Sequence, residues 1–281
     1  MARNPASIRP AYLISSQDKV YTISFDLTGK NFIAVGTDKN VKIFSLKTRR
    51  AVREYQLTSI AISTHLLDDT IYVYVKGGKL FKAHGLSEKT CIYETEFDGF
   101  CKAFYDVDAK NILVPNGVND FNGIDTLNLD GERKFRCYLE KEGLPFCQEI
   151  KHNQLYIGFE SGKVAIFEAN IQTFTPKFLY QIARPGIPIT SFAMGESGHI
   201  LAVSAEEMIF RLSEQNLTKF DEQEITNKGI NAVIGQVFLF FFEYWLLNFE
   251  QGSFKKIGTL HDFACHPCAG AMLIFSVSFQ F

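Results

Sequence analysis

The chain has 281 residues, 46% of them hydrophobic, so it can bury a sizeable core, and its composition excludes general disorder. Its 29 basic and 31 acidic residues give a net charge of -2, which excludes the broad basic surface of a nucleic-acid-binding protein. We therefore expect no nucleic-acid partner. The first ten residues lack the apolar run of a secretory signal, so we expect a cytoplasmic or nuclear protein with reduced cysteines.

Short runs of β-branched and aromatic residues separated by polar turns predict an all-β protein. The first unit predicts four strands, at residues 20–25, 31–36, 41–46 and 50–56, with a turn at 37–40. A later unit repeats the pattern, with strands at 154–158 and 163–167 around a turn at 159–162. In this comparison Gly36 and Gly158 are expected to occupy the same place. Four consecutive strands per unit are typical of a propeller blade.

The repeat length indicates the type of propeller. The first strands of successive units are expected to begin near Val20, Ser59, Phe100, Phe146, Ile189 and Gly229, which gives spacings of 39, 41, 46, 43 and 40 residues. This period with four strands per repeat is typical of WD40 repeats, although the Trp-Asp and Gly-His pairs are absent. Because one four-stranded sheet cannot bury both faces, the blades must pack around a ring. We therefore predict a single WD40-type β-propeller over residues 1–281, with seven blades.

Several short stretches resemble one WD40 family in their order and spacing. Residues 46–52, 143–147, 156–164 and 226–230 resemble the G-protein β-subunit-like protein 1 family, whose fungal counterpart is ASTRA-associated protein 1. The resemblance runs from about residue 10 to residue 234. It implies a seven-bladed adaptor without catalytic residues. It also implies protein partners in the maturation of PI3-kinase-related kinases, namely the triple-T assembly and Hsp90-linked co-chaperones, or in an ASTRA-type chromatin complex.

After Gly235 the sequence departs from that family, because a Phe-rich stretch at 237–251 replaces the expected strands of blade 6. A translated intron is one interpretation, since pyrimidine-rich codons encode Phe, and a buried pair of strands is another. We expect blades 1 to 5 at about 16–228, and an irregular blade 6 with a partial blade 7 at about 229–281. Residues 9–15 are expected to close the ring by adding an outer strand to the last blade.

The sequence gives little support for a membrane span, a metal site or a catalytic motif. The apolar run 230–249 has the length of a membrane span, but Glu243 within it costs about 2.5–3.5 kcal/mol, which disfavours insertion. Cys265 and Cys268 have the spacing of half a zinc site, and no second pair accompanies them. The nucleophile-elbow, phosphate-loop and dinucleotide motifs are missing as well. We therefore expect a protein that is not an enzyme and binds no metal and no cofactor.

Arg49 and Arg50 are the candidate partner-docking residues. Basic clusters bind phosphoinositide head groups, so a peripheral membrane propeller is the alternative function. The simpler interpretation is a solvated turn that leads into an outer strand. The leading hypothesis is a non-catalytic scaffold that binds proteins through loops on one face and through blade edges.

Overall fold

The regular structure of the chain is entirely β in the part that the computed structural model describes. The described residues are 20–85, 89–118, 121–169, 171–173, 175–194, 200–206, 209–212, 217–219, 230–234, 238–242, 245–250, 253–258, 262–266 and 271–275. Within these ranges every pair of neighbouring strands in a sheet is antiparallel. No helix in the described ranges has the length and apolar character needed to cross a membrane. The all-β prediction is confirmed.

The first three sheets are four-stranded meanders, with strands side by side in chain order. The first contains β1 (Val20–Phe25), β2 (Asn31–Gly36), β3 (Asn40–Ser45) and β4 (Arg50–Gln56). The second contains β5 (Ala61–Leu67), β6 (Thr70–Val75), β7 (Lys79–His84) and β8 (Thr90–Glu94). The third contains β9 (Phe104–Asp106), β10 (Asn111–Val118), β11 (Phe121–Leu127) and β12 (Arg133–Glu140).

The next three sheets have the same order, and a two-stranded sheet follows them. The fourth contains β13 (Pro145–Lys151), β14 (Gln154–Phe159), β15 (Lys163–Glu168) and β16 (Phe178–Gln181). The fifth contains β17 (Ile189–Met194), β18 (Ile200–Ser204), β19 (Ile209–Leu212) and β20 (Leu217–Lys219). The sixth contains β21 (Ile230–Ile234), β22 (Phe238–Phe242), β23 (Trp245–Glu250) and β24 (Ser253–Gly258), and the last contains β25 (Asp262–His266) and β26 (Ala271–Phe275).

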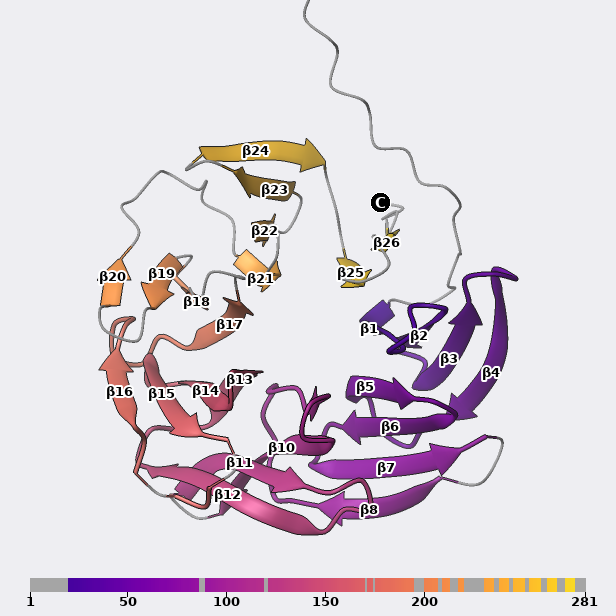
Figure 1. The fold of residues 1–281 in the computed structure, drawn as a ribbon, viewed down its shortest axis with the longest axis horizontal. Helices are drawn as coiled ribbons and strands as arrows, with labels where there is room; N and C mark the ends of the chain where they lie inside the picture. Colours follow the sequence, from indigo (N-terminus) through magenta and orange to yellow (C-terminus); the bar gives the residue numbers. More distant parts are fainter. Residues whose placement is uncertain are drawn as a thin grey trace, which may run out of the picture.

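These seven sheets are the blades of a propeller. Figure 1 shows them around a ring, with β1, β5, β13, β17, β21 and β25 nearest the centre. β1 contacts both β5 and β25, so the first and last described sheets are neighbours in the ring. Six inner strands begin no more than four residues from the positions predicted by the repeat spacing. The repeat period therefore located the blades correctly.

A shared bulge fixes how the blades align with one another. β1, β5, β13, β17 and β21 each shift register against the next strand at their second residue. Before this bulge, Val20 pairs with Gly36, and Pro145 pairs with Phe159. Gly36 is therefore equivalent to Phe159, and the expected equivalence of Gly36 and Gly158 is wrong by one residue. Gly158 instead lies where a Cβ atom would come within 2.7 Å of the Ile189 side chain in the next blade.

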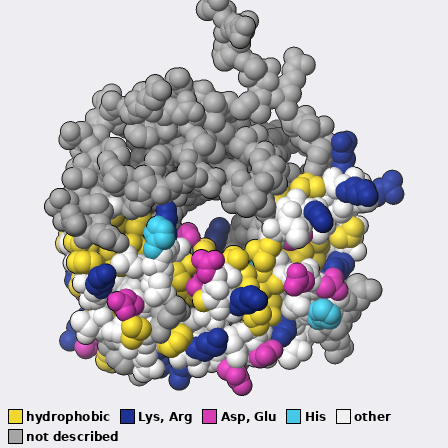
Figure 2. Space-filling view, in the orientation of Figure 1, with side chains coloured by type: hydrophobic (Ala, Val, Ile, Leu, Met, Phe, Trp, Pro, Cys, Tyr) yellow, Lys and Arg dark blue, Asp and Glu magenta, His cyan; other side chains and the backbone are white. Residues whose placement is uncertain are grey.

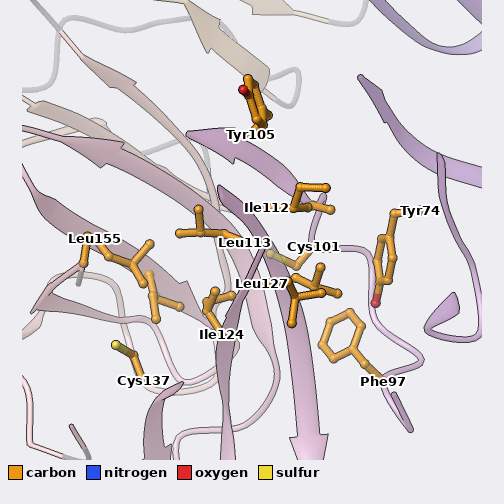
Figure 3. Packing of buried hydrophobic residues seen from close by; sticks show 14 of the residues in the cluster. Tyr74, Phe97, Cys101, Tyr105, Ile112, Leu113, Ile124, Leu127, Cys137 and Leu155 are labelled. Atoms are coloured by element: carbon orange, nitrogen blue, oxygen red, sulfur yellow. The ribbon is translucent and has the colours of Figure 1, made fainter. Parts of the chain in front are cut away.

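The core lies between the blades, because successive side chains of a strand point to opposite faces of its sheet. In β6, Ile71, Val73 and Val75 join a cluster shared with the first blade, whereas Tyr72 and Tyr74 join a cluster shared with the third. Figure 3 shows the second of these clusters, in which Tyr74 and Phe97 lie beside the buried residues of the third sheet. Strands buried on both faces explain the nearly continuous apolar runs in the sequence.

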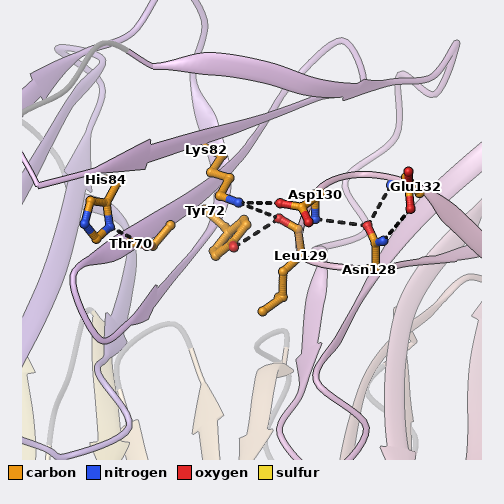
Figure 4. A network of polar contacts seen from close by, with 8 residues as sticks. All are labelled: Thr70, Tyr72, Lys82, His84, Asn128, Leu129, Asp130 and Glu132. Carbon is orange, nitrogen blue, oxygen red and sulfur yellow. Dashed lines mark hydrogen bonds and ion pairs between the residues drawn. The ribbon is translucent and has the colours of Figure 1, made fainter.

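Polar contacts also join the second and third blades. Lys82 Nζ donates to the Leu129 carbonyl at 3.1 Å and lies 2.8 Å from Asp130 Oδ1, while the Tyr72 hydroxyl donates to the same carbonyl at 3.1 Å. Asn128 accepts backbone hydrogen bonds that hold this turn in shape (Figure 4). The turn between β11 and β12 is therefore anchored on the neighbouring sheet.

Thr173 of the fourth blade pairs with the outer strand of the third. The Thr173 amide donates to the Arg136 carbonyl at 3.1 Å, and the Tyr138 amide donates to the Thr173 carbonyl at 3.4 Å. These bonds form a parallel bridge between Thr173 and Cys137 of β12. Because an uncovered edge strand can pair with another chain, this bridge protects the rim of the third blade.

The last third of the chain contains the Phe-rich stretch. Its backbone supplies β22 and β23, and the sixth sheet has the same four-strand order as the five before it. Residues 9–15, expected to close the ring, lie outside the described residues, as do residues 237, 243, 244 and 251 of the Phe-rich stretch.

Candidate functional site

One face of the ring carries the links between blades together with the turns between second and third strands. Hydrogen bonds join the links to the turns. The Lys76 amide, in a turn, donates to the Ile60 carbonyl, in a link, at 2.8 Å, and the Thr95 amide, in a link, donates to the Gly78 carbonyl, in a turn, at 2.9 Å. We call this the connection face. It carries turns 37–39, 76–78 and 160–162 and links 57–60, 95–103, 141–144 and 182–188. The link 95–103 is the longest of these four.

The long link exists because the inner strand of the third blade is short. β9 has three residues, whereas β1, β5, β13 and β17 have six or seven. The adjacent β10 contains Pro115, which has no N–H to donate to a neighbouring strand. The Pro115 carbonyl is instead bonded by the Tyr74 hydroxyl of the second blade, at 3.4 Å. The sheet is thus incomplete on its inner side near the connection face.

Side chains from both neighbouring blades complete the missing hydrogen bonds. Gln148 Nε2 of β13 donates to the Lys102 carbonyl at 2.7 Å and to the Leu113 carbonyl at 3.1 Å. His65 Nε2 of β5 donates to the Ala103 carbonyl at 3.0 Å. Burial lowers the pKa of His65, and the positive charge of Lys102 lowers it further against the opposing effect of the Ala103 carbonyl. The imidazole is therefore neutral, with its hydrogen on Nε2.

The link bends at Gly99, and its residues alternate between buried and exposed from Phe97 to Ala103. We call residues 96–103 the Phe100 segment. Its buried residues are Phe97, Gly99, Cys101 and Ala103, and its exposed residues are Asp98, Phe100 and Lys102. A Cβ atom on Gly99 would collide with the Phe97 ring, so only glycine fits there. Burial raises the pKa of the Cys101 thiol, which makes it an unreactive part of this packed base.

Phe100 is the exposed centre of this region. Its side chain is 54% exposed, its ring centroid lies 6.3 Å from that of Phe146, and Lys76 Nζ lies 5.3 Å from it. Phe146 is the bulged second residue of β13. Lys76, Phe100, Lys102 and Phe146 come from three consecutive blades, and we call them the Phe100 patch. A half-exposed aromatic ring with one lysine over it, on a well-packed base, has the composition of an interface hot spot.

Arg49 and Arg50 lie on the opposite face of the ring from this patch. Both side chains are exposed, at the turn between β3 and β4. The Arg49 backbone has a φ of 58°, and its amide donates to the Ser45 carbonyl at 2.7 Å. Figure 2 shows basic and acidic side chains interspersed in the described part of one face, around a central hollow. The two arginines and the Phe100 patch are therefore separate candidate sites.

A buried carboxylate in the third blade belongs to the packing and not to the exposed surface. Asp125 is fully buried and accepts hydrogen bonds from Arg136 Nε at 3.0 Å, Asn116 Nδ2 at 2.6 Å and the hydroxyls of Tyr93 and Tyr138. Burial raises the pKa of both tyrosines, and the nearby negative charge raises it further, so both hydroxyls stay protonated and donate. Tyr93 comes from β8, so the network also joins two blades.

Acidic residues are few on the described inner strands. They are Asp106, Glu149 and Asp262. Asp106 is used locally, because its carboxylate accepts the amides of residues 108 and 109 at 3.1 Å. Burial raises the pKa of Glu149 on β13 to about 7, despite the lowering effect of Lys151. The described residues contain no group of three or more metal-ligating side chains. Of the two cysteines spaced as in half a zinc site, only Cys265 is described, within β25.

Comparisons with known proteins support the class of fold. No protein-family model matches the chain, and no curated protein matches it. BamB from Moraxella catarrhalis has a TM-score of 0.63 at 13% identity, covering 90% of this chain and 80% of BamB. The computationally designed Ika8 protein has a TM-score of 0.67 at 12% identity, covering 89% and 79%. The β-propeller domain of Cps50 (Swd1) from Myceliophteria thermophila has a TM-score of 0.64 at 9% identity, covering 83% and 81%.

At these identities the likeness concerns the fold alone. The protein is an all-β propeller, with its strands arranged as consecutive four-stranded blades in the first six described sheets. The sequence prediction of this fold is confirmed. The Phe100 patch, in contrast, was not singled out from sequence, where Phe100 served only to mark the start of a repeat. Pro115 was the available signal, because a proline within a central strand indicates a break in the sheet.

Proposed function

We propose that this protein is a non-catalytic scaffold that binds partner proteins through the Phe100 patch. The observation that carries the proposal is the 54% exposure of Phe100 between Lys76 and Phe146, on a segment whose alternate residues are buried. A large apolar side chain is held in solvent by a rigid base. Binding residues are commonly found on loops fixed in this way by a stable scaffold.

The particular pathway is proposed from the family resemblance. Partners would be the triple-T assembly, Hsp90-linked co-chaperones and PI3-kinase-related kinases, or an ASTRA-type chromatin complex, in the cytoplasm or nucleus. One link to the patch supports this assignment, because Phe146 lies within the stretch 143–147 that resembles the family.

Affinity purification of the tagged full-length chain followed by mass spectrometry tests the proposal. Phe100→Ala should reduce the captured partners about tenfold or more, because aromatic hot spots contribute about 2 kcal/mol or more. Val107→Ala is the matched control, since Val107 is 52% exposed in a turn on the opposite face. Recovery of triple-T or Hsp90-linked proteins would support the pathway. Equal capture by both variants would overturn the assignment of the patch.

A second candidate function uses Arg49 and Arg50. Their adjacent, exposed positions at one turn suit the docking of an acidic partner or a phosphoinositide head group. Liposome flotation with phosphatidylinositol 4,5-bisphosphate vesicles tests whether the head group is the ligand. The wild-type chain should float with the vesicles, and the double variant Arg49→Ala/Arg50→Ala should not. Lys141→Ala is the control, because Lys141 is also exposed with a positive φ, of 65°. Flotation that does not change in the double variant would argue against this candidate.

A further inference from the structure

One ammonium group of the second blade lies over the exposed Phe100 ring and has no carboxylate of its own. Lys76 is exposed, and its Nζ lies 5.3 Å from the centre of that ring. Among the described residues, no acidic side chain forms an ion pair with it. Lys79, three residues further along the same hairpin, pairs instead with Glu94 at 2.9 Å. The charge of Lys76 is therefore available to a binding partner.

Hydrogen bonds hold the turn that carries Lys76 against the Phe100 segment. The Lys76 amide donates to the Ile60 carbonyl at 2.8 Å, and the Gly78 carbonyl accepts from the Thr95 amide at 2.9 Å. A Cβ atom on Gly78 would come within 2.4 Å of the Thr95 carbonyl oxygen, so the turn and the link are in direct contact. Because the backbone is fixed on both sides, an ion pair at Lys76 would order only one side chain of this protein.

Phe146 of the fourth blade extends the apolar surface beside the same ring. The two rings are inclined at 48° with their centroids 6.3 Å apart, and the backbone of Phe146 is held at the bulge of β13. Phe100 is half-exposed and Phe146 is half-buried. An apolar side chain that covered these rings would also exclude water from an ion pair at Lys76, and an ion pair is stronger where water is excluded.

We propose that the partner contacts this surface with one bulky apolar side chain and one carboxylate that lie close together in its sequence. The inference rests on the proposed protein-binding function and specifies the side chains that are recognised. The apolar side chain packs on the Phe100 and Phe146 rings, and the carboxylate pairs with Lys76. An ion pair of about 2.8 Å places this carboxylate within about 8 Å of the Phe100 ring centre. Residues that are adjacent or two apart in a peptide span such a distance.

The charges of the Phe100 segment favour a single carboxylate over a polyanion. Glu96 and Asp98 are exposed on the same segment as Phe100. A nucleic acid or an anionic membrane presents many phosphates, which would bring further negative charge near these two carboxylates. A peptide with one acidic residue avoids this repulsion. The surface therefore suits a protein segment of mixed composition.

A peptide array probed with the labelled full-length chain tests the proposal. Each peptide has Gly-Ser flanks around a core of four serines, two of which are replaced. The first class contains Phe and Asp in every order and separation. The matched classes contain Phe with Asn, or Ala with Asp, at the same positions. A polyanion class contains three Asp and no Phe.

We expect the best arrangement of Phe and Asp to bind about tenfold or more tightly than its Asn and Ala counterparts. Lys76→Met should abolish the preference for Asp over Asn but keep that for Phe over Ala, and Lys76→Arg should keep both. Phe100→Ala should abolish the preference for Phe. Lys79→Met is the matched control and should change neither preference, because Lys79 is already paired with Glu94.

Three outcomes would overturn the inference. The first is that no arrangement of Phe and Asp binds better than its counterparts. The second is a preference for Asp that persists in Lys76→Met, or that is lost in Lys102→Met instead. The third is strongest binding by the class with three Asp, which would indicate a polyanion as the ligand. In each case, loss of captured partners in Phe100→Ala would leave the proposed function standing, whereas unchanged capture in that variant would overturn both.

Discussion

Arg136 holds Asp125 in the interior of the third blade, with Nε donating to Oδ1 at 3.0 Å while the Asp125 side chain is fully buried. Arg136→Leu would leave that carboxylate without its cation. Removing one partner of a buried ion pair costs about 3–5 kcal/mol, and we expect about 3 because Asn116 and two tyrosine hydroxyls still donate. Urea unfolding measures the change. The control is Asp130→Ala, which breaks an exposed pair with Lys82 and should cost less than about 1 kcal/mol. Equal losses of stability in Arg136→Leu and Asp130→Ala would contradict a stabilising role of the buried ion pair.

The carboxyl of Glu149 predicts a pH dependence of stability. Its pKa in the folded protein is raised to about 7 by burial, from an ordinary value of 4.5, so the folded state holds this proton more tightly than the unfolded state. The contribution of Glu149 to stability is thus fully present below pH 4.5 and is lost as pH rises through 7. Glu149→Gln should match the wild type near pH 4.5 and melt roughly 5–10 °C higher at pH 8, because the raised pKa corresponds to about 3 kcal/mol. Thermal unfolding at the two pH values checks this, and a difference that does not vary with pH would contradict it.

Gln148 supports the Phe100 segment from below. Gln148→Leu would leave the Lys102 and Leu113 carbonyls without their donor, at a cost of about 2 kcal/mol. Amide hydrogen exchange should accelerate in residues 96–104, and capture of partners should fall even though Gln148 itself is buried. Gln181→Leu is the matched control, because Gln181 also bridges two carbonyls but is exposed. Its cost should stay below about 0.5 kcal/mol. If amide hydrogen exchange in residues 96–104 did not change in Gln148→Leu, Gln148 would not be supporting this segment.

The hairpin between β13 and β14 offers a stabilising change. His152 and Asn153 have φ values of 48° and 61°, which are the two positive values of a type I′ turn. Asn tolerates this left-handed conformation better than His, so His152→Asn should stabilise the fold by about 0.5 kcal/mol. Chemical denaturation provides the measurement, and His152→Val, a β-branched residue unsuited to positive φ, should destabilise it. The reverse order of the two variants would contradict the turn assignment.

Sequence predicted the propeller because its signal is repeated. Each blade contributes apolar strands at a regular period, so errors of a few residues in single strands do not change the ring. The same regularity hid the candidate site. Phe100 was predicted to start an ordinary inner strand. Pro115 in the adjacent strand interrupts that pairing, so the inner strand begins only at Phe104.

The register between blades and the contacts between them could not be predicted from one sequence. Aligned on the bulge at the second residue of each inner strand, Gly36 of the first blade is equivalent to Phe159 of the fourth. Bulges have no fixed residue type by which a sequence would reveal them. The partners of Asp125 come from three strands, including Tyr93 in the preceding blade. Contacts between separate repeats depend on how blades pack, which the period alone does not specify. The placement of Arg49 and Arg50 at an exposed turn was predicted, and their role stays a prediction.

The bridge from Thr173 to β12 limits how this propeller can be taken apart. Residue 173 lies between β15 and β16 of the fourth blade, yet its amide and carbonyl both bond to the third. Transplanting either of these two blades without the other would separate groups that form one hydrogen-bonded unit. The pair of blades spanning residues 104–181 contains the whole bridge, so exchange of repeats with another propeller should move this pair together.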